Sequence, residues 1–203
     1  MSATVPTVTP APTAATAFAP LGRFTATQRL LHWTMAACIL AMLFIGVGMV
    51  STITTKYVTL VSIHRPLGIA ILVLAILRLA VRLRFGAPPL PPDMPEPMKL
   101  AAKLSHWVFY GLMIAMPVIG WAMLSAANYP VVMWGGFTLP PILPPSEATH
   151  AILWNAHFTL AFAFFALILV HLAAALFHAL VRRDGVFEAM APVPSGRGGV
   201  PAE

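Results

Sequence analysis

The sequence predicts an all-α integral membrane protein, a four-helix bundle with both termini in the cytoplasm. Of its 203 residues, 59% are hydrophobic and only 9% are charged, and the mean hydropathy is +0.85. Soluble domains carry about 25% charged residues. Four apolar stretches are long enough to cross a bilayer, and they are residues 30–50, 59–81, 104–124 and 153–181.

The basic residues predict the orientation of these helices. Ten of the twelve lysines and arginines flank the four stretches on one side, and only Lys56 and Arg65 lie on the other. Because lysine and arginine concentrate in cytoplasmic segments, we expect the termini and residues 82–103 to be cytoplasmic. The net charge of +6 is therefore interpreted as a topology signal, and no nucleic-acid partner is expected.

The ends of the chain are expected to lie outside the bundle. Residues 1–22 are rich in Ala, Thr and Pro and carry no charge, which predicts a disordered cytoplasmic tail rather than a signal peptide. Residues 191–203 are expected to be a second disordered tail. Thr25 and Gln28 have the spacing of a capping box that would open the first helix. The bundle itself is expected over residues 23–190.

Several prolines in the middle of the chain predict helix starts, a kink and a non-helical connector. Pro66 is expected in the first turn of the second helix, where the missing N–H is harmless. The proline-rich connector 86–97 is expected to be non-helical and stiff. Within the third helix, Pro117 and Gly120 predict a kink. The second outer loop, roughly residues 125–152, is expected to fold over the outer end of the bundle, with His150 as a loop histidine.

Three histidines share one face of the last helix. His157, His171 and His178 are 14 and then 7 residues apart, and at 100° per residue both steps return almost to the same face. The first pair is separated by about 21 Å along the axis. The intervening residues carry no charge. This helix therefore resembles one wall of a channel with two cofactor sites.

The predicted topology gives each histidine a depth. His64 and His157 would lie together near the outer face. His32 would lie near the cytoplasmic face, opposite either His171 or His178, and helical spacing alone leaves that choice open. Ionisable residues within a membrane are costly and usually functional. Two depth-matched pairs of histidines on three helices therefore predict two ligand sites.

Haem iron is the ligand that best suits such pairs, because it accepts two neutral imidazoles from facing helices. The alternative is an ion transporter or proton pathway, which normally needs carboxylates within the membrane. All six acidic residues are expected in loops or tails. Zinc would need four ligands close together, which two separate pairs do not supply.

Five segments together resemble the bacterial cytochrome b561 family, which is related to the b-type cytochrome subunits of nickel-iron hydrogenase and formate dehydrogenase. They are RFTATQRLLHW, HRPLGIAILVLAILRLAVRL, the PPLPP connector, KLSHWVFYGLMIAMPVIGWAM and HLAAALFHALVRRDGVFEAM. The resemblance implies two haem b groups, with His64 and His157 as ligands of the outer iron and His32 and His171 as ligands of the cytoplasmic one. The chain departs from the family where Arg65-Pro66 replaces Lys-Ser and where His178-Ala179 replaces paired histidines.

The resemblance also implies a function. We expect electron transfer across the bacterial cytoplasmic (inner) membrane to or from a quinone. A sharper option is oxidation of superoxide at the outer face with reduction of ubiquinone, as some small members of the family are thought to do. A second option is a haem-bearing membrane anchor that passes electrons for a soluble dehydrogenase or hydrogenase. Besides membrane lipid, the expected partners are therefore a quinone and either superoxide or a redox protein.

Four more residues are candidates for supporting roles. Arg78 lies 14 residues after His64 and would be either a haem-propionate partner or a snorkelling anchor. Arg65 would either pair with a propionate at the outer site or be an interfacial cation. His106 and His178 are spare cytoplasmic imidazoles, each either a quinone or proton site or a plain interfacial residue.

Overall fold

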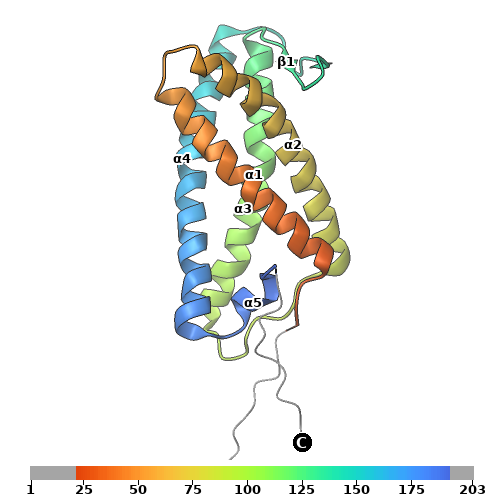
Figure 1. The fold of residues 1–203 in the computed structure, drawn as a ribbon, viewed down its shortest axis with the longest axis vertical. Coiled ribbons are helices and arrows are strands. Elements are labelled where there is room, and N and C mark those ends of the chain that lie inside the picture. Colours follow the sequence, from red (N-terminus) through yellow and green to blue (C-terminus); the bar gives the residue numbers. More distant parts are fainter. Residues whose placement is uncertain (1–21, 193–203) are drawn as a thin grey trace, which may run out of the picture.

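Four long helices run the length of the molecule in a computed structural model that describes residues 22–192 (Figure 1). The elements are α1 (Ala26–Val50), α2 (Lys56–Phe85), α3 (Glu96–Ala126), β1 (Val131–Val132), β2 (Thr138–Leu139), α4 (Glu147–Phe177), a π-helical turn (His178–Arg182) and α5 (Val186–Met190). All four long helices are apolar and long enough to cross a membrane. The expected all-α membrane bundle is thus confirmed, while the two predicted tails lie almost wholly outside the described residues.

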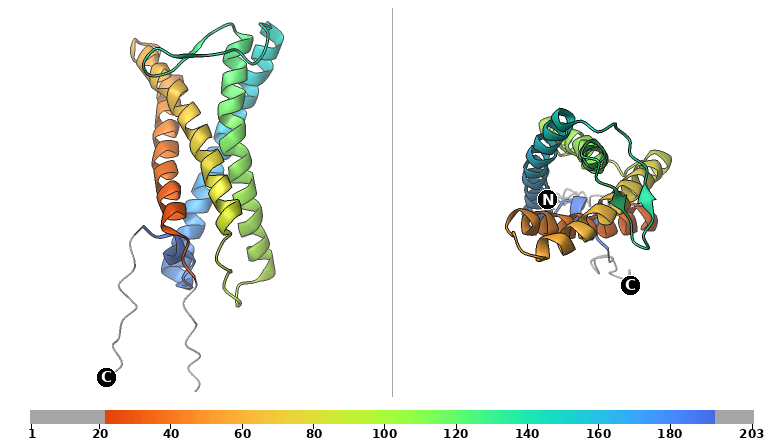
Figure 2. Two further views of the ribbon diagram at one scale, coloured as in Figure 1. Left: turned by 90° about the vertical axis from the view of Figure 1, so that its right-hand side faces the viewer. Right: turned by 90° about the horizontal axis from the view of Figure 1, so that it is seen from above.

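The bundle consists of two helix pairs. α1 packs along α2, α3 packs along α4, and α2 joins the pairs by packing against α3, whereas α1 and α4 make few direct contacts. The two pairs are visible side by side in Figure 2. Both ends of the described chain, residues 22 and 192, lie at the end that carries α5 (Figure 1). We call this the α5 end, and the opposite one, which carries β1 and β2, the hairpin end.

The start of α1 is fixed by the expected capping box. Thr25 accepts a hydrogen bond from the backbone N–H of Gln28, and the side chain of Gln28 accepts one from the backbone N–H of Thr25. The amide of Gln28 also donates to the carbonyl of Gly86 at 2.8 Å, just past the end of α2. One buried side chain therefore caps α1 and ties it to α2.

Three boundary predictions were wrong. α2 begins at Lys56, so Pro66 lies in the helix interior and is fully buried, rather than in the first turn. α4 begins at Glu147, so His150 lies in its first turn, where Nδ1 is 3.1 Å from the Met123 carbonyl. Three acidic residues lie in helices, not in loops or tails: Glu96 and Glu147 open α3 and α4, and Glu188 lies in α5. α2, α3 and α4 continue into polar residues beyond their apolar stretches, whereas α5 is a separate short helix.

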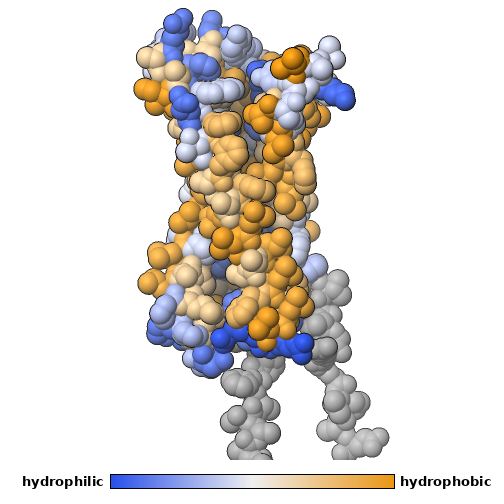
Figure 3. All heavy atoms as spheres, turned by 90° about the vertical axis from the view of Figure 1, so that its left-hand side faces the viewer, coloured by the Kyte–Doolittle hydropathy of each residue, from blue (hydrophilic) through white to orange (hydrophobic). Residues whose placement is uncertain are grey.

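The buried core is a thin layer near the middle of the bundle. Met35, Ala75, Met113 and Phe164 form its buried cluster, one residue from each long helix. Phe164 lies seven residues from both His157 and His171, so this mid-bundle layer separates the two ends. Outside, the molecule carries an apolar band with polar residues at both ends, and its surface is hollowed toward the α5 end (Figure 3).

The connection between α3 and α4 is held against the hairpin end, as expected. The guanidinium of Arg65 donates to the carbonyl of Pro130 at 3.3 Å. The indole of Trp121 donates to the carbonyl of Pro140 at 3.0 Å. The hydroxyl of Ser125 accepts from the backbone N–H of Ile142 at 3.1 Å. These bonds fix the connection to α2 and α3 rather than leaving it free.

Candidate functional site

At the hairpin end, α2 and α4 bring His64 and His157 together. Their ring centroids lie 6.2 Å apart, and the ring planes are inclined by 64°. The Nδ1 atom of His64 is buried without a hydrogen-bond partner. Buried polar atoms are normally satisfied, so an imidazole in this state suggests that the space beside the ring is made for a ligand.

At the α5 end, α1 and α4 bring His32 and His171 together in the same way. Their ring centroids lie 6.3 Å apart at 62°, and Nδ1 of His32 is again buried without a partner. His106 of α3 lies at the same centroid distance from His171. The ring of Phe109 packs edge-on against His171 at 5.1 Å. Three imidazoles therefore cluster at this site of the α5 end, whereas two form the pair at the hairpin end.

Both pair distances fit two imidazoles that share one metal ion. Two rings that bind one ion from opposite sides have centroids about 6.3 Å apart, because a metal–imidazole bond is about 2.0–2.1 Å and the nitrogen lies about 1.1 Å from its ring centroid. The observed distances are 6.2 Å and 6.3 Å. The two rings of a pair are thus too far apart for a direct hydrogen bond and correctly spaced for an ion between them.

Each pair joins two helices that are not packed closely on each other. His64 and His157, like His32 and His171, bridge the two helix pairs across the interior, where the helices that carry them pack less closely than neighbours do. All four rings remain partly accessible, although they face the inside of the bundle. No cluster of three or more metal-binding side chains forms within residues 22–192.

Gly120 of α3 makes room for His157. A Cβ atom at this position would lie 3.3 Å from Cε1 and 3.6 Å from Nδ1 of the imidazole. The first distance is closer than an ordinary van der Waals contact. The absence of a side chain therefore lets the His157 ring lie against α3. The sequence suggested only a kink at this glycine, because helical periodicity does not show which neighbouring helix approaches it.

The two candidate arginines lie at opposite ends. Arg78 places its guanidinium 5.9 Å from the ring centroid of Tyr110, within electrostatic range of His32 and His171. It forms no ion pair with any carboxylate in residues 22–192. Arg65 lies next to His64 and is held by the Pro130 carbonyl. Both sites thus have a cation beside them, and the cation at the α5 end has no counter-ion from the described chain.

His178 lies apart from the three imidazoles of the α5 end. It is 9% exposed, and its Nδ1 lies 2.8 Å from the carboxylate of Asp184. Of the two histidines that helical spacing offered as partners for His32, His171 is therefore the one that lies opposite it. His178 is held by a different set of residues.

The sequence that folds into these four long apolar helices matches a known family. A sequence model described as prokaryotic cytochrome b561 matches residues 23–192. The chain belongs to the prokaryotic cytochrome b561 family. As a b561 cytochrome it is a multi-pass bacterial membrane protein, and its cofactor is b-type haem.

Curated relatives agree with this assignment. The b561 chain is 29% identical over 182 residues to cytochrome b561 homolog 1 of Escherichia coli strain K12, which covers 85% of this chain and 98% of the relative. It is 37% identical over 139 residues to the probable superoxide oxidase CybB of Yersinia pestis, and this match covers 66% of this chain and 76% of the relative. Cytochrome b561 homolog 2 of Escherichia coli strain K12 is 28% identical over 162 residues, and this match covers 78% of this chain and 86% of the relative.

Proposed function

We propose that this cytochrome holds two haem b groups, one between His64 and His157 and the other between His32 and His171. The observation that carries the proposal is the pair of imidazole–imidazole distances, 6.2 and 6.3 Å, which repeat at both ends of the bundle. The resemblance of the last helix to the family's H-x13-H pattern supports His157 and His171 as two of the four ligands. Residues 23–190 would form this di-haem unit.

His106 is a weaker candidate for a haem ligand than His32, although it lies equally far from His171. Because α3 packs directly against α4, His106 and His171 belong to the same helix pair. A porphyrin between them would have to separate two packed helices. His32 approaches His171 from the other helix pair, which leaves the interior for the macrocycle.

The proposed ligand set determines the chemistry. Held by two imidazoles, a haem b would supply a reversible one-electron couple, which favours electron transfer over oxygen binding. The chain would orient each imidazole and exclude water with its apolar helices. Arg78 would pair with a propionate at the α5 end, supported by its lack of a carboxylate partner among the described residues. Arg65 would do the same at the hairpin end.

We propose that electrons cross the bacterial inner membrane to a quinone, with His106 and His178 at the quinone or proton site of the α5 end. The positive-inside distribution supports a cytoplasmic α5 end with both termini on that side. Superoxide is a candidate donor at the hairpin end, since one relative is named a probable superoxide oxidase. Lys56 and Arg65 are the basic residues at that end that would attract an anion.

A second candidate function is an anchor for a soluble dehydrogenase or hydrogenase. The connection at the hairpin end exposes three aromatic side chains, with Tyr129 61%, Trp134 62% and Phe137 64% accessible. Aromatic residues are enriched at protein interfaces, so this surface would suit a redox protein. Copurification of a stoichiometric metal-containing partner would support the anchor, whereas quinone-linked turnover by the isolated cytochrome would contradict it.

Haem content tests the main proposal. Reduced-minus-oxidised absorbance of the purified protein is expected to give a b-type α-band, and extraction is expected to give two haems per chain. His64→Ala and His171→Ala should each remove one haem. His150→Ala is the matched control, because His150 lies in α4 outside both pairs, and it should retain both haems. Unchanged haem content in the first two variants would refute the ligand assignment.

A further inference from the structure

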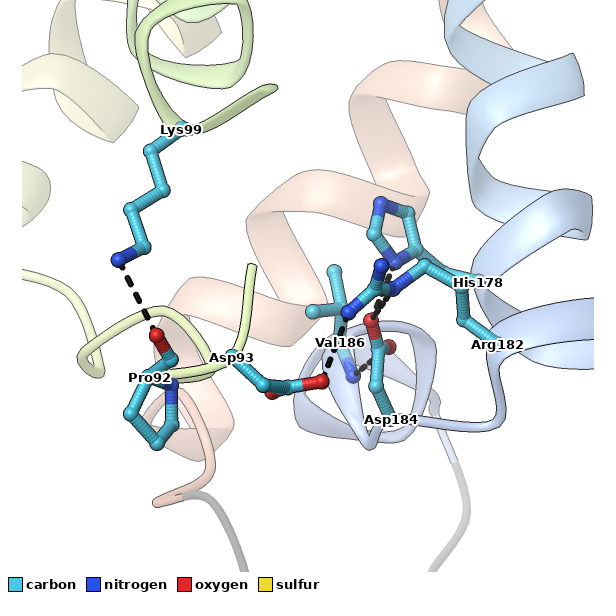
Figure 4. A network of polar contacts seen from close by, with 7 residues as sticks. All are labelled: Pro92, Asp93, Lys99, His178, Arg182, Asp184 and Val186. Carbon is cyan, nitrogen blue, oxygen red and sulfur yellow. Dashed lines mark hydrogen bonds and ion pairs between the residues drawn. The ribbon is translucent and has the colours of Figure 1, made fainter. Parts of the chain in front are cut away.

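A network of charged groups closes the α5 end around Asp184 (Figure 4). The side chain of Asp184 is only 8% exposed. Its Oδ2 atom accepts hydrogen bonds from Nδ1 of His178 and Nε of Arg182, both at 2.8 Å. Its Oδ1 atom accepts one from the backbone N–H of Val186 at 3.3 Å. The carboxylate is thus surrounded by donors.

The backbone of this region is shaped to bring Asp184 onto His178. The helix widens into a π-helical turn at His178–Arg182, and the backbone N–H of Arg183 donates to the carbonyl of His178 at 2.7 Å. Arg183 and Gly185 then adopt positive φ values of 52° and 81°. Positive φ is uncommon in a non-glycine residue, and single π turns frequently occur at functional sites. The chain folds back by this route and places the carboxylate beside the imidazole.

A second carboxylate extends the network to another part of the chain. The guanidinium of Arg182 also binds Asp93 of the α2–α3 connector, with Nη2 and Oδ2 3.0 Å apart. Arg182 therefore bridges a half-exposed aspartate on the connector and a buried one after α4. The other charged groups on the elements that meet here are Arg183 in the turn and Glu188 of α5, and neither forms an ion pair with His178 within residues 22–192.

The network determines which nitrogen of His178 carries a proton. Burial by itself would raise the pKa of Asp184, but hydrogen bonds from Arg182, His178 and the Val186 backbone outweigh it, so the pKa lies below its usual value. An ionised carboxylate can only accept hydrogen bonds, so Nδ1 of His178 must donate. Nε2 is then the nitrogen that can gain and lose a proton. In Figure 4 it points away from Asp184 and into the bundle.

We propose that Asp184 is a positioning residue that holds His178 with Nε2 toward the bundle interior, where this imidazole passes protons to and from a bound quinone. The inference rests on the proposed quinone-linked function and adds the group that orients the proton carrier. His178 lies seven residues beyond His171 on nearly the same helical face, or about 10 Å along the axis. A quinone headgroup beside Nε2 would therefore be close to the haem proposed at the α5 end.

The step balances in protons and electrons. Reduction of a quinone to its quinol consumes two electrons and two protons. Under the proposed function the electrons come from a one-electron donor by way of the haems. Each proton comes from water at the α5 end, binds Nε2 of His178, and leaves for a quinone oxygen. The Asp184 carboxylate stabilises the imidazolium while it exists and does not itself become protonated, the role that a carboxylate has beside a catalytic histidine.

Stopped-flow reoxidation of the reduced holoprotein by a water-soluble short-chain ubiquinone tests the proposal. Asp184→Asn should retain both haems and their reduction by dithionite, while the saturating reoxidation rate falls about tenfold to a hundredfold, in line with the loss of an oriented acid–base group. The quinone concentration for half-maximal rate should change much less. Asp184→Glu should recover part of the rate. Glu96→Gln, which removes an exposed carboxylate at the same end, should match the wild type.

The outcomes separate this inference from the function on which it rests. Reoxidation of Asp184→Asn at the wild-type rate would overturn the role of Asp184. A wild-type protein that ubiquinone does not reoxidise at all would instead overturn the proposed quinone function.

Nitrogen-15 NMR of histidine-labelled protein measures which ring nitrogen of His178 carries the proton. The spectrum of His178→Gln identifies the His178 signal, so this test leaves Asp184 unchanged. A protonated Nδ1 is expected, and a neutral ring protonated at Nε2 would contradict the proposal.

Discussion

Gly120 of α3 lies against the imidazole of His157 so closely that a methyl group would come within 3.3 Å of its Cε1 atom. The ring can keep its position only because this residue has no side chain. An alanine would push the imidazole by a few tenths of an ångström away from α3, and this shift would change its distance and angle to the ring of His64. The position of one proposed haem ligand thus depends on a residue in a helix that contributes no ligand to that pair.

Gly120→Ala should therefore weaken haem binding at the hairpin end. We expect partial or complete loss of one of the two haems, measured by pigment extraction and by the amplitude of the α-band. Gly111→Ala is the matched control, since a Cβ there meets nothing within 4 Å. In a helix interior, alanine is intrinsically favoured over glycine by about 0.5–1 kcal/mol. Equal haem content in both variants would show that the contact with His157 is unimportant.

Phe164→Ala should destabilise the whole bundle. Phe164 is 7% exposed and belongs to the mid-bundle layer. Truncation of a buried phenylalanine costs roughly 3–5 kcal/mol of unfolding free energy. Its neighbour Phe165 is 46% exposed, and Phe165→Ala should cost far less. Thermal unfolding of both variants in detergent measures the difference, and a similar loss in each would contradict the assigned core.

Arg78→Gln should lower the reduction potential of the haem at the α5 end. A positive charge beside the haem disfavours the oxidised form, which carries one more positive charge than the reduced form. Removing the charge should lower the midpoint by tens of millivolts, since 59 mV corresponds to about 1.4 kcal/mol in a one-electron couple. Arg84→Gln, which alters an exposed arginine at the end of the same helix, should leave both potentials in place. A spectroscopic redox titration checks this, and an unmoved potential in Arg78→Gln would exclude the contact with a propionate.

Gln28→Ala should loosen the α5 end without touching a haem ligand. The side chain of Gln28 is buried, completes the capping box of α1 and donates to the Gly86 carbonyl. Its removal leaves the backbone N–H of Thr25 without its partner, which costs roughly 1–3 kcal/mol, while the Gly86 carbonyl keeps its hydrogen bond from Arg82. Thr27→Ala, at an exposed position in the same turn, should have little effect. Hydrogen exchange at the start of α1 measures the change, and equal protection in both variants would refute it.

The sequence predicts the four helices well because hydrophobic length is a strong signal, but it does not show where they begin. α2, α3 and α4 extend into polar residues, which is why Pro66 and His150 were misplaced. Depth and helical periodicity predict that His64 lies with His157, and they leave His171 and His178 as equal partners for His32. The structure distinguishes these two, because His171 lies opposite His32 while His178 is hydrogen-bonded to Asp184.

Other features of the site depend on how helices approach one another, which a single sequence does not encode locally. The contact of Gly120 with His157 and the position of His106 beside His171 are set by the packing of α3 on α4. The side chain of Asp184 reaches its partners His178 and Arg182 because the backbone turns through a positive φ at Arg183. Phe164 is the exception, since its place halfway between His157 and His171 can be read from its spacing.

The mid-bundle layer has a consequence for energy conservation. Met35, Ala75, Met113 and Phe164 fill the bundle with hydrocarbon between its two histidine groups. Under the proposed function, electrons would tunnel through this layer, whereas hydrated ions and protons would not pass it, so no compensating charge would accompany an electron that crosses. Each transfer then works with or against the transmembrane voltage, worth about 2.3 kcal/mol per charge for every 100 mV spanned. The distribution of electrons between the two ends would therefore depend on the voltage across the host membrane.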